Sequence, residues 1–274
     1  MTNRSPSDES ETRLKVEEWF DKAEDLLSRI RSTQLDAIIE TSDMCAKAIE
    51  AGGLVHLFGT GHSRIALEEM FPRYGSFPGF HPMAELSMTF HTQVVGSNGQ
   101  RQAMFIERVE GLGEVILSNF HFGEADVMIV FSAGGTTAVP IEVAIGAKER
   151  GLPVVVVTAV DHSMAGTVTH PSGTRLLDHA DIVIDLGTPV GDSLVEISSD
   201  QTRVGPGSTV ANAAIVNTIK VATAARLDAV GALPPVISSS AVVGSDASAE
   251  LFDGAYADHA VRLARLLSAG DDVG

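Results

Sequence analysis

From Leu54 onward, short aliphatic runs alternate with segments of helical spacing, and this alternation constrains the fold more than any other feature. The predicted strands are Leu54–Phe58, Ala103–Ile106, Val127–Phe131, Val154–Thr158 and Ile182–Leu186. Three of them are continuous aliphatic runs, which is typical of strands buried on both faces of a parallel sheet. Parallel strands need crossover connections, and these are usually helices. The sequence therefore predicts an α/β fold with a doubly wound parallel sheet.

The predicted helices fill the spaces between and around these strands. A helix is expected from about Thr137 to Arg150, because Pro140 suits a first turn and Gly151 suits a helix end. Apolar residues at helical spacing predict two helices before the first strand and two near the end of the chain. Residues 1–11 are polar and are expected to be a disordered tail. Residues 12–230 are expected to form one domain, on which a loop and helix at 231–274 pack.

Composition narrows the classes of partner. Hydrophobic residues make up 44% of the 274 residues, which is enough to fill a core. The formal net charge of −17 argues against nucleic acid and anionic membranes as partners. Cys45 is the only cysteine, so the chain can form no internal disulfide. With no signal peptide and no apolar run long enough to cross a bilayer, the expected location is cytoplasmic.

Two predicted strands end in turns rich in glycine and hydroxyl residues. The first turn is Gly59–Ser63, and the second is Ser132–Thr137. Backbone N–H groups of such turns, together with the helix N-termini that follow, bind phosphate. A dinucleotide fingerprint would need a small residue where Arg64 stands, and a Walker loop would need Gly-Lys-Ser/Thr, which the sequence lacks. The turns predict one pocket for a phosphorylated ligand, and tight strand–helix connections with helix caps are the alternative interpretation.

Several motifs carry a resemblance to a known family. They are Gly59–Ser63, Ala138–Glu142, Ala147–Leu152, Gly191–Ile197 and Val204–Val210. With them, the chain from about Leu35 to Leu227 resembles the SIS (sugar isomerase) family, and most closely a stand-alone bacterial branch with phosphoheptose isomerase-like members. The resemblance implies a three-layer α/β/α sandwich on a five-stranded parallel sheet. It also implies a homodimer or higher homo-oligomer with a sugar phosphate as ligand. No cofactor is expected, and no metal site is expected either, because His81 and Glu85 are a single pair at ligand spacing, with Pro82 between them.

The family's phosphate loop usually reads Ser-x-Ser-Gly-x-Thr/Asn/Ser, and the second turn matches it at Ser132, Gly135 and Thr137. Gly134 stands where the central serine is expected, which removes a hydroxyl donor worth about 1 kcal/mol. The residues expected to bind the phosphate or the sugar are Gly59, Thr60, Gly61, Ser63, Ser132, Gly134, Gly135, Thr136, Thr137, Ser208 and Thr209.

Isomerisation between an aldose and a ketose needs a base that moves a proton between C1 and C2, and an acid that opens the ring. The acidic candidates are Glu85, Glu107 and Glu110, among which we favour Glu110 and then Glu85. Glu107–Gly111 resembles a helix start that carries catalytic acids in some relatives. His62, inside the first turn, is the best-placed imidazole, and His162 follows the fourth predicted strand.

These residues also have interpretations without a catalytic role. Each glutamate can be a solvated helix residue, and His62 can serve the structure of the turn. The favoured function is isomerisation of a sugar phosphate. A non-catalytic phosphosugar sensor and a lyase acting on an amino-sugar phosphate ether share the same fold, and fold alone does not separate these functions.

Overall fold

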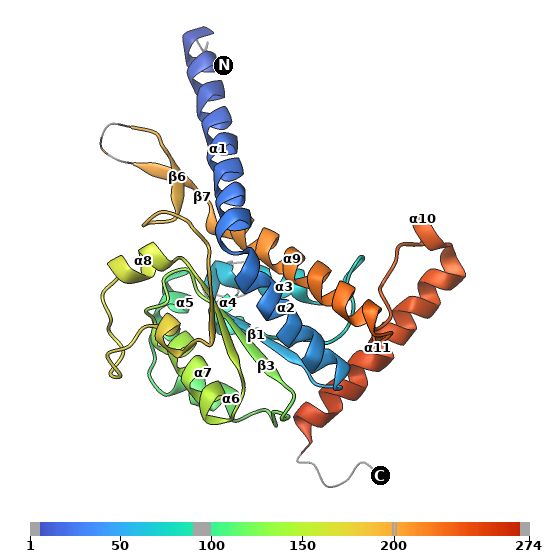
Figure 1. Ribbon diagram of the computed structural model, residues 1–274. Coiled ribbons are helices and arrows are strands. Elements are labelled where there is room, and N and C mark those ends of the chain that lie inside the picture. Colours follow the sequence, from blue (N-terminus) through green and yellow to red (C-terminus); the bar gives the residue numbers. More distant parts are fainter. Residues whose placement is uncertain (1–5, 90–99, 199, 201, 269–274) are drawn as a thin grey trace.

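A computed structural model describes residues 6–89, 100–198, 200 and 202–268. At its centre is a parallel sheet of five strands in the order β2-β1-β3-β4-β5 (Figure 1). The strands are β1 (Val55–Gly59), β2 (Phe80–Met83), β3 (Val127–Phe131), β4 (Val154–Thr158) and β5 (Ile182–Asp185). The predicted doubly wound α/β fold is confirmed. Because β2 lies on one side of β1 and β3 on the other, the order of the strands reverses between β1 and β3, and ligands of open α/β sheets bind at such a point.

The position of the second strand differs from the prediction. Ala103–Ile106 belongs to helix α5 (Gln100–Ile106), and the strand that pairs with β1 is Phe80–Met83. A run of four apolar residues does not distinguish a strand from a buried helix segment. Pro82 argues against a central strand, but β2 lies at the edge of the sheet, where proline is tolerated.

Helices cover both faces of the sheet and complete the three layers (Figure 1). One face packs against α2 (Leu35–Glu50), α3 (Arg64–Met70) and α9 (Ser208–Ala229). The other packs against α4 (Leu86–Thr89), α6 (Leu112–Leu117) and α7 (Ala138–Glu149). Successive strand residues point to opposite faces, so Ile129 lies in the first core and its neighbour Val130 in the second.

Helix α1 (Pro6–Thr33) projects beyond the sheet, and the hairpin of β6 (Ser193–Glu196) and β7 (Arg203–Pro206) lies beside it (Figure 1). We call α1 and this hairpin the arm. The indole N–H of Trp19 donates to the Gly205 carbonyl oxygen at 3.4 Å. Gly205 has φ +77°, and a Cβ there would lie 2.5 Å from the Trp19 ring, so only glycine allows this approach.

The start of α1 also differs from the expected tail at residues 1–11, because the helix begins at Pro6. Residues 1–5 lie outside the described part of the chain. The exposed turns of α1 carry ion pairs at helical spacing, Arg13 with Glu17 at 2.9 Å and Lys15 with Glu18 at 2.8 Å. Such pairs each stabilise a helix by about 0.2–0.5 kcal/mol, and they support a helix that has little apolar contact near its start.

The C-terminal segment folds back onto the domain. After α10 (Ser240–Val243), the long helix α11 (Ser245–Leu267) crosses the end of α2 (Figure 1). The Arg262 guanidinium donates to the carbonyl oxygens of Ile49 and Gly53 at 2.9 and 2.8 Å and pairs with Asp258 at 2.7 Å. Among the described helices, none combines the length and the apolar character that a membrane crossing needs.

Candidate functional site

The two glycine turns lie next to each other at the carboxyl edge of the sheet. In the β1–β3 pairing, Gly59 is opposite Phe131, so the turns that begin at Thr60 and Ser132 leave the sheet at the same level. This is the place where the strand order reverses. A ligand bound there would contact both turns at once.

The second turn has a defined backbone conformation. Gly135 adopts φ +58°, and its N–H donates to the Ser132 hydroxyl at 3.1 Å. A Cβ at Gly135 would lie 3.0 Å from Ser163 Oγ and 3.1 Å from Thr158 Oγ1, so the turn requires glycine at this position. Thr137 is the N-cap residue of α7 in extended conformation, and its side chain makes no capping hydrogen bond. The Thr137 hydroxyl is therefore not committed to the helix.

The first turn begins with Thr60 in extended conformation and continues as a single helical turn, η1 (Gly61–Ser63), that leads into α3. Gly61 adopts φ +56°. His62 is exposed, and Ser63 is half-buried with its N–H donating to the Thr60 carbonyl oxygen at 3.0 Å. Thr60 is buried, and its hydroxyl donates to Glu107 Oε2 at 2.7 Å.

Glu107 connects the first turn to the start of α7, the helix that follows the second turn. Its carboxylate accepts the Thr60 hydroxyl, and its backbone carbonyl accepts the N–H of Val139, in the first turn of α7, at 3.0 Å. Burial raises the pKa of the Glu107 carboxyl, although the Thr60 hydrogen bond and the charge of Arg108 oppose the shift. A partly buried carboxyl with a raised pKa in such a place is a candidate acid or base.

The segment that carries Glu107 is clamped to α7 by a second glutamate. Glu142 accepts the backbone N–H groups of Gly111 and Gly113 at 2.6 and 2.8 Å, and its Oε1 lies 3.5 Å from His170 Nε2. A Cβ at Gly113 would lie 2.4 Å from Glu142 Cβ, so the backbone approaches α7 as closely as glycine permits. The resemblance motif Ala138–Glu142 contains Glu142, but nothing in the sequence indicates this contact.

The other two acids predicted from the sequence differ in their exposure. Glu110 is exposed in the turn that follows Glu107, and Glu85 is half-buried between β2 and α4. Glu107, the third candidate, makes a hydrogen bond with Thr60 of the first turn.

Ser208 and Thr209 lie at the start of α9, which contacts η1. The backbone N–H and the hydroxyl of Ser208 both donate to the Asp192 carboxylate, at 2.8 and 2.6 Å. The Ser208 hydroxyl is thus committed to Asp192 and does not cap α9, whose N-cap residue is Gly207. Thr209, the next residue, is half-buried.

A second polar cluster lies at the amino ends of the strands. His56 of β1 is fully buried, and its Nε2 lies 3.0 Å from Asp126 Oδ2 while its Nδ1 lies 3.0 Å from Nδ1 of His81. Asp126 also accepts the N–H groups of Leu54 and Gly123 at 2.8 and 2.7 Å. Burial lowers the pKa of His81 to about 3, and the hydrogen bond from His56 helps to keep the pKa of Asp126 low. We call His56, His81 and Asp126 the buried triad.

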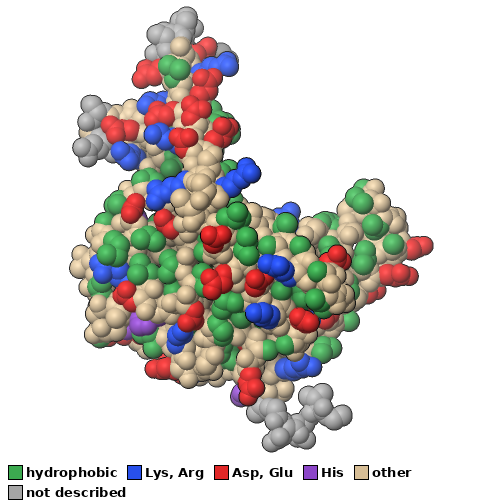
Figure 2. All heavy atoms as spheres, viewed as in Figure 1, with side chains coloured by type: hydrophobic (Ala, Val, Ile, Leu, Met, Phe, Trp, Pro, Cys, Tyr) green, Lys and Arg blue, Asp and Glu red, His purple; other side chains and the backbone are tan. Residues whose placement is uncertain are grey.

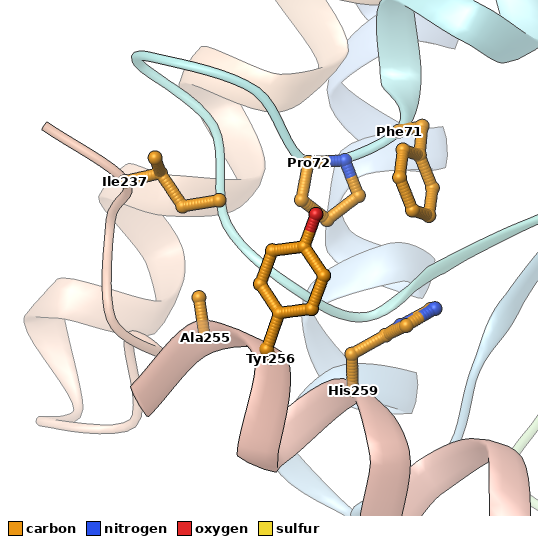
Figure 3. A pocket seen from close by; sticks show the side chains of 6 residues that line it. All are labelled: Phe71, Pro72, Ile237, Ala255, Tyr256 and His259. Atoms are coloured by element: carbon orange, nitrogen blue, oxygen red, sulfur yellow. The ribbon is translucent and has the colours of Figure 1, made fainter. Parts of the chain in front are cut away.

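One pocket among the described residues lies away from both turns. A small apolar pocket beside α11 is lined by Phe71, Pro72, Ile237, Ala255, Tyr256 and His259 (Figure 3). Its lining includes no residue of either turn. Over residues 6–89, 100–198, 200 and 202–268, no three His, Cys, Asp or Glu side chains are grouped so that they could hold a metal ion.

Comparison with known proteins finds a matching family, curated relatives and similar solved structures. Residues 18–159 match the SIS domain family. A UPF0309 protein of Listeria innocua is 32% identical over 231 residues, which cover 84% of this chain and 91% of that protein. A UPF0309 protein of Streptomyces coelicolor is 32% identical over 229 residues, covering 83% and 89%. Among solved structures, a phosphoheptose isomerase from Francisella tularensis aligns with a TM-score of 0.49 at 13% identity, covering 76% of this chain and 96% of that one.

Proposed function

The chain belongs to the SIS domain family, and we propose that it binds a phosphorylated sugar at the two turns and interconverts its aldose and ketose forms in the cytoplasm. The observation that carries this proposal is the hydrogen bond from Thr60 to Glu107. It places a carboxyl whose pKa is raised by burial directly against a turn suited to phosphate or sugar oxygens.

The turns supply donors for the phosphate without using cations. The uncommitted hydroxyl of Thr137 and the backbone of Gly134 and Gly135 stand at the N-terminus of α7, a helix of 12 residues. The helix dipole favours an anion there. In the first turn of α7 the Val139 N–H already donates to the Glu107 carbonyl oxygen and Pro140 has no N–H, so the backbone donor that this turn can offer is the N–H of Ala138. This mode of binding suits a chain with a net charge of −17, because it needs no basic surface.

The proposed chemistry is proton transfer at the carbon atoms of an opened sugar. Glu107, as the base, would remove the proton from C2 of an aldose and return it to C1, while the proton of the C2 hydroxyl passes to the C1 oxygen through the enediol. The raised pKa of Glu107 makes the return of the proton to carbon easier at neutral pH. His62 is exposed at the first turn, where an incoming sugar can reach it, and we propose it for ring opening.

Binding is tested first with a panel of hexose and heptose phosphates. We expect at least one of them, at millimolar concentration, to raise the melting temperature, because a ligand at 100 times its Kd stabilises the folded state by about 2.7 kcal/mol. The same sugars without phosphate are the controls and should give no shift. If no sugar phosphate stabilises the protein, the ligand class is wrong; if one does so without turnover, the sensor function replaces the isomerase.

The arm gives a reason to propose a homodimer. Leu14, Phe20 and Val204 are exposed to 62%, 57% and 49%, and Figure 2 shows that the arm stands clear of the body. Exposed apolar side chains on a projecting element are typical of a contact surface, and a second copy of the chain provides a matching surface through two-fold symmetry.

We expect the unmodified chain to sediment as a dimer and the double substitution Leu14→Glu, Phe20→Glu to shift it to a monomer, because both copies would bring like charges into the contact. Ser28→Glu, at another exposed position of α1, is the matched control and should leave the dimer intact. Sedimentation velocity measures the difference, and an unmodified chain that is monomeric at all concentrations would contradict the proposal.

A further inference from the structure

Helix α8 (Val160–Ala165) lies against the second turn. It follows β4, the strand next to β3, and two of its successive residues face the two glycines of the turn. A Cβ at Gly134 would lie 3.8 Å from both Cδ2 and Nε2 of His162, and a Cβ at Gly135 would lie 3.0 Å from Ser163 Oγ. The Ser163 side chain therefore fills the space beside Gly135, whereas the space beside Gly134 stays open as far as the His162 ring.

The His162 ring is held by its other nitrogen. The backbone N–H of Gly191, in the loop after β5, donates to His162 Nδ1 at 3.0 Å. A nitrogen that accepts this hydrogen bond carries no proton, so the neutral ring has its proton on Nε2. Nε2–H is thus a donor on the side of Gly134, and no described residue accepts a hydrogen bond from it within the contacts of this structure.

The loop that holds the ring is itself fixed. Gly191 adopts φ +88°, and the next residue, Asp192, accepts the N–H and hydroxyl of Ser208 at the start of α9. The orientation of the imidazole is therefore set before any ligand arrives, and a hydrogen bond from a pre-oriented donor costs little side-chain entropy.

We propose that His162 is a specificity-determining residue that donates from Nε2 to a phosphate oxygen bound at the second turn. This inference rests on the proposed function. His162 would supply a side-chain donor beside Gly134, which has no side chain of its own. The donor is uncharged, in keeping with a site built from backbone and hydroxyl groups. The ligand class that it favours is a phosphate monoester, whose oxygens accept from several directions.

The test compares His162→Leu and His162→Gln in the full chain. Leucine removes the donor, and glutamine returns an N–H group at about the distance of Nε2. With inorganic phosphate and glucose 6-phosphate as probes in calorimetry, we expect His162→Leu to weaken binding about tenfold, as the loss of a hydrogen bond to a charged group does. His162→Gln should recover most of the affinity. His121→Leu, at an exposed position outside the turns, is the matched control and should bind as the unmodified chain does.

The tautomer gives a readout that needs no ligand. Two-dimensional ¹H–¹⁵N NMR of the histidine rings, assigned with the His162→Leu variant, should show His162 neutral with its proton on Nε2. A proton on Nδ1, or unchanged binding of both probes by His162→Leu, overturns the inference while leaving the proposed function standing. If the unmodified chain binds neither probe nor any sugar phosphate, the proposed function fails first, and this inference fails with it.

Discussion

Glu107→Gln is expected to lower the kcat of sugar-phosphate isomerisation at least 100-fold while leaving the Kd of the sugar phosphate nearly unchanged. Glutamine keeps an oxygen that accepts the Thr60 hydroxyl, so the contact with the first turn survives. It does not accept a proton from carbon, and general base catalysis contributes about 10²–10⁴-fold. Turnover assays together with calorimetry on the same variant separate the loss of chemistry from a loss of binding.

The matched control is Glu110→Gln. It makes the same chemical change three residues further along the chain, at an exposed position, and should not affect kcat. A loss of turnover in this variant, with Glu107→Gln active, would return the base to the residue that the sequence favours.

Thr60→Val tests whether Glu107 acts as the base through the pH dependence of the rate. A purely structural role of Glu107 would leave this pH dependence unchanged. The Thr60 hydrogen bond lowers the pKa of Glu107, so removing it should raise that pKa further. A base must be ionised to act, and the acid limb of the pH–rate profile should therefore move to higher pH.

The sequence predicts the part of the site that depends on local pattern. The aliphatic runs of β1 and β3 each lead into a glycine turn, and parallel pairing places such turns at one edge of the sheet. The start and end of α7 follow from Pro140 and Gly151, and they agree with the observed Ala138–Glu149 to within a residue or two. Each of these features is determined by residues that are close to it in the sequence.

Features that depend on distant residues are not visible in the sequence. Thr60 and Glu107 are 47 residues apart, and the choice between Glu107 and Glu110 depends on how the turn after α5 is clamped by Glu142. The strand Phe80–Met83 is recognisable only once β1 is there to pair with it. The orientation of His162 depends on the backbone of Gly191, in a loop beyond the next strand. None of these contacts produces a periodic pattern in the sequence from which it could be predicted.

Asp126→Ala is expected to cost about 3–5 kcal/mol of unfolding free energy, because three donors lose their acceptor at about 1–3 kcal/mol each. The Asp126 carboxylate accepts from Leu54, Gly123 and His56, and its side chain is only 7% exposed. Alanine leaves two backbone N–H groups and one imidazole N–H without that acceptor, in a place that water reaches poorly. Denaturant unfolding followed by circular dichroism measures the loss.

Asp181 provides a matched control within the same sheet. Asp181 precedes β5 and accepts the Val154 N–H at 2.7 Å, much as Asp126, which precedes β3, accepts the Leu54 N–H. Its side chain is 40% exposed and pairs with Lys148 at the surface. Asp181→Ala should therefore cost about 1 kcal/mol. If both variants lose the same unfolding free energy, the burial of Asp126 contributes nothing beyond the hydrogen bond to a strand N–H that both aspartates make.

The buried triad should also make the fold sensitive to acid. The pKa of His81 is about 3 in the folded chain and 6.5 as its ordinary value, so between these two values the unfolded chain binds a proton that the folded chain does not. The contribution of His81 to the free energy of unfolding is therefore fully present above pH 6.5. It falls as the pH is lowered toward about 3, by up to about 1.4 kcal/mol per pH unit. The lowered pKa of Asp126 adds a further loss only below its ordinary value of 3.8.

His81→Asn isolates this contribution, because asparagine offers a hydrogen-bonding group to His56 Nδ1 but does not titrate. Between about pH 6 and about pH 4, the free energy of unfolding of this variant should fall less steeply than that of the unmodified chain, by close to one proton. A residual slope is expected from His179 and His259, whose pKa values are also lowered by burial. If the two slopes are equal, His81 takes up its proton in the folded chain as it does in the unfolded chain, and its imidazolium then donates from Nδ1 to His56 Nδ1.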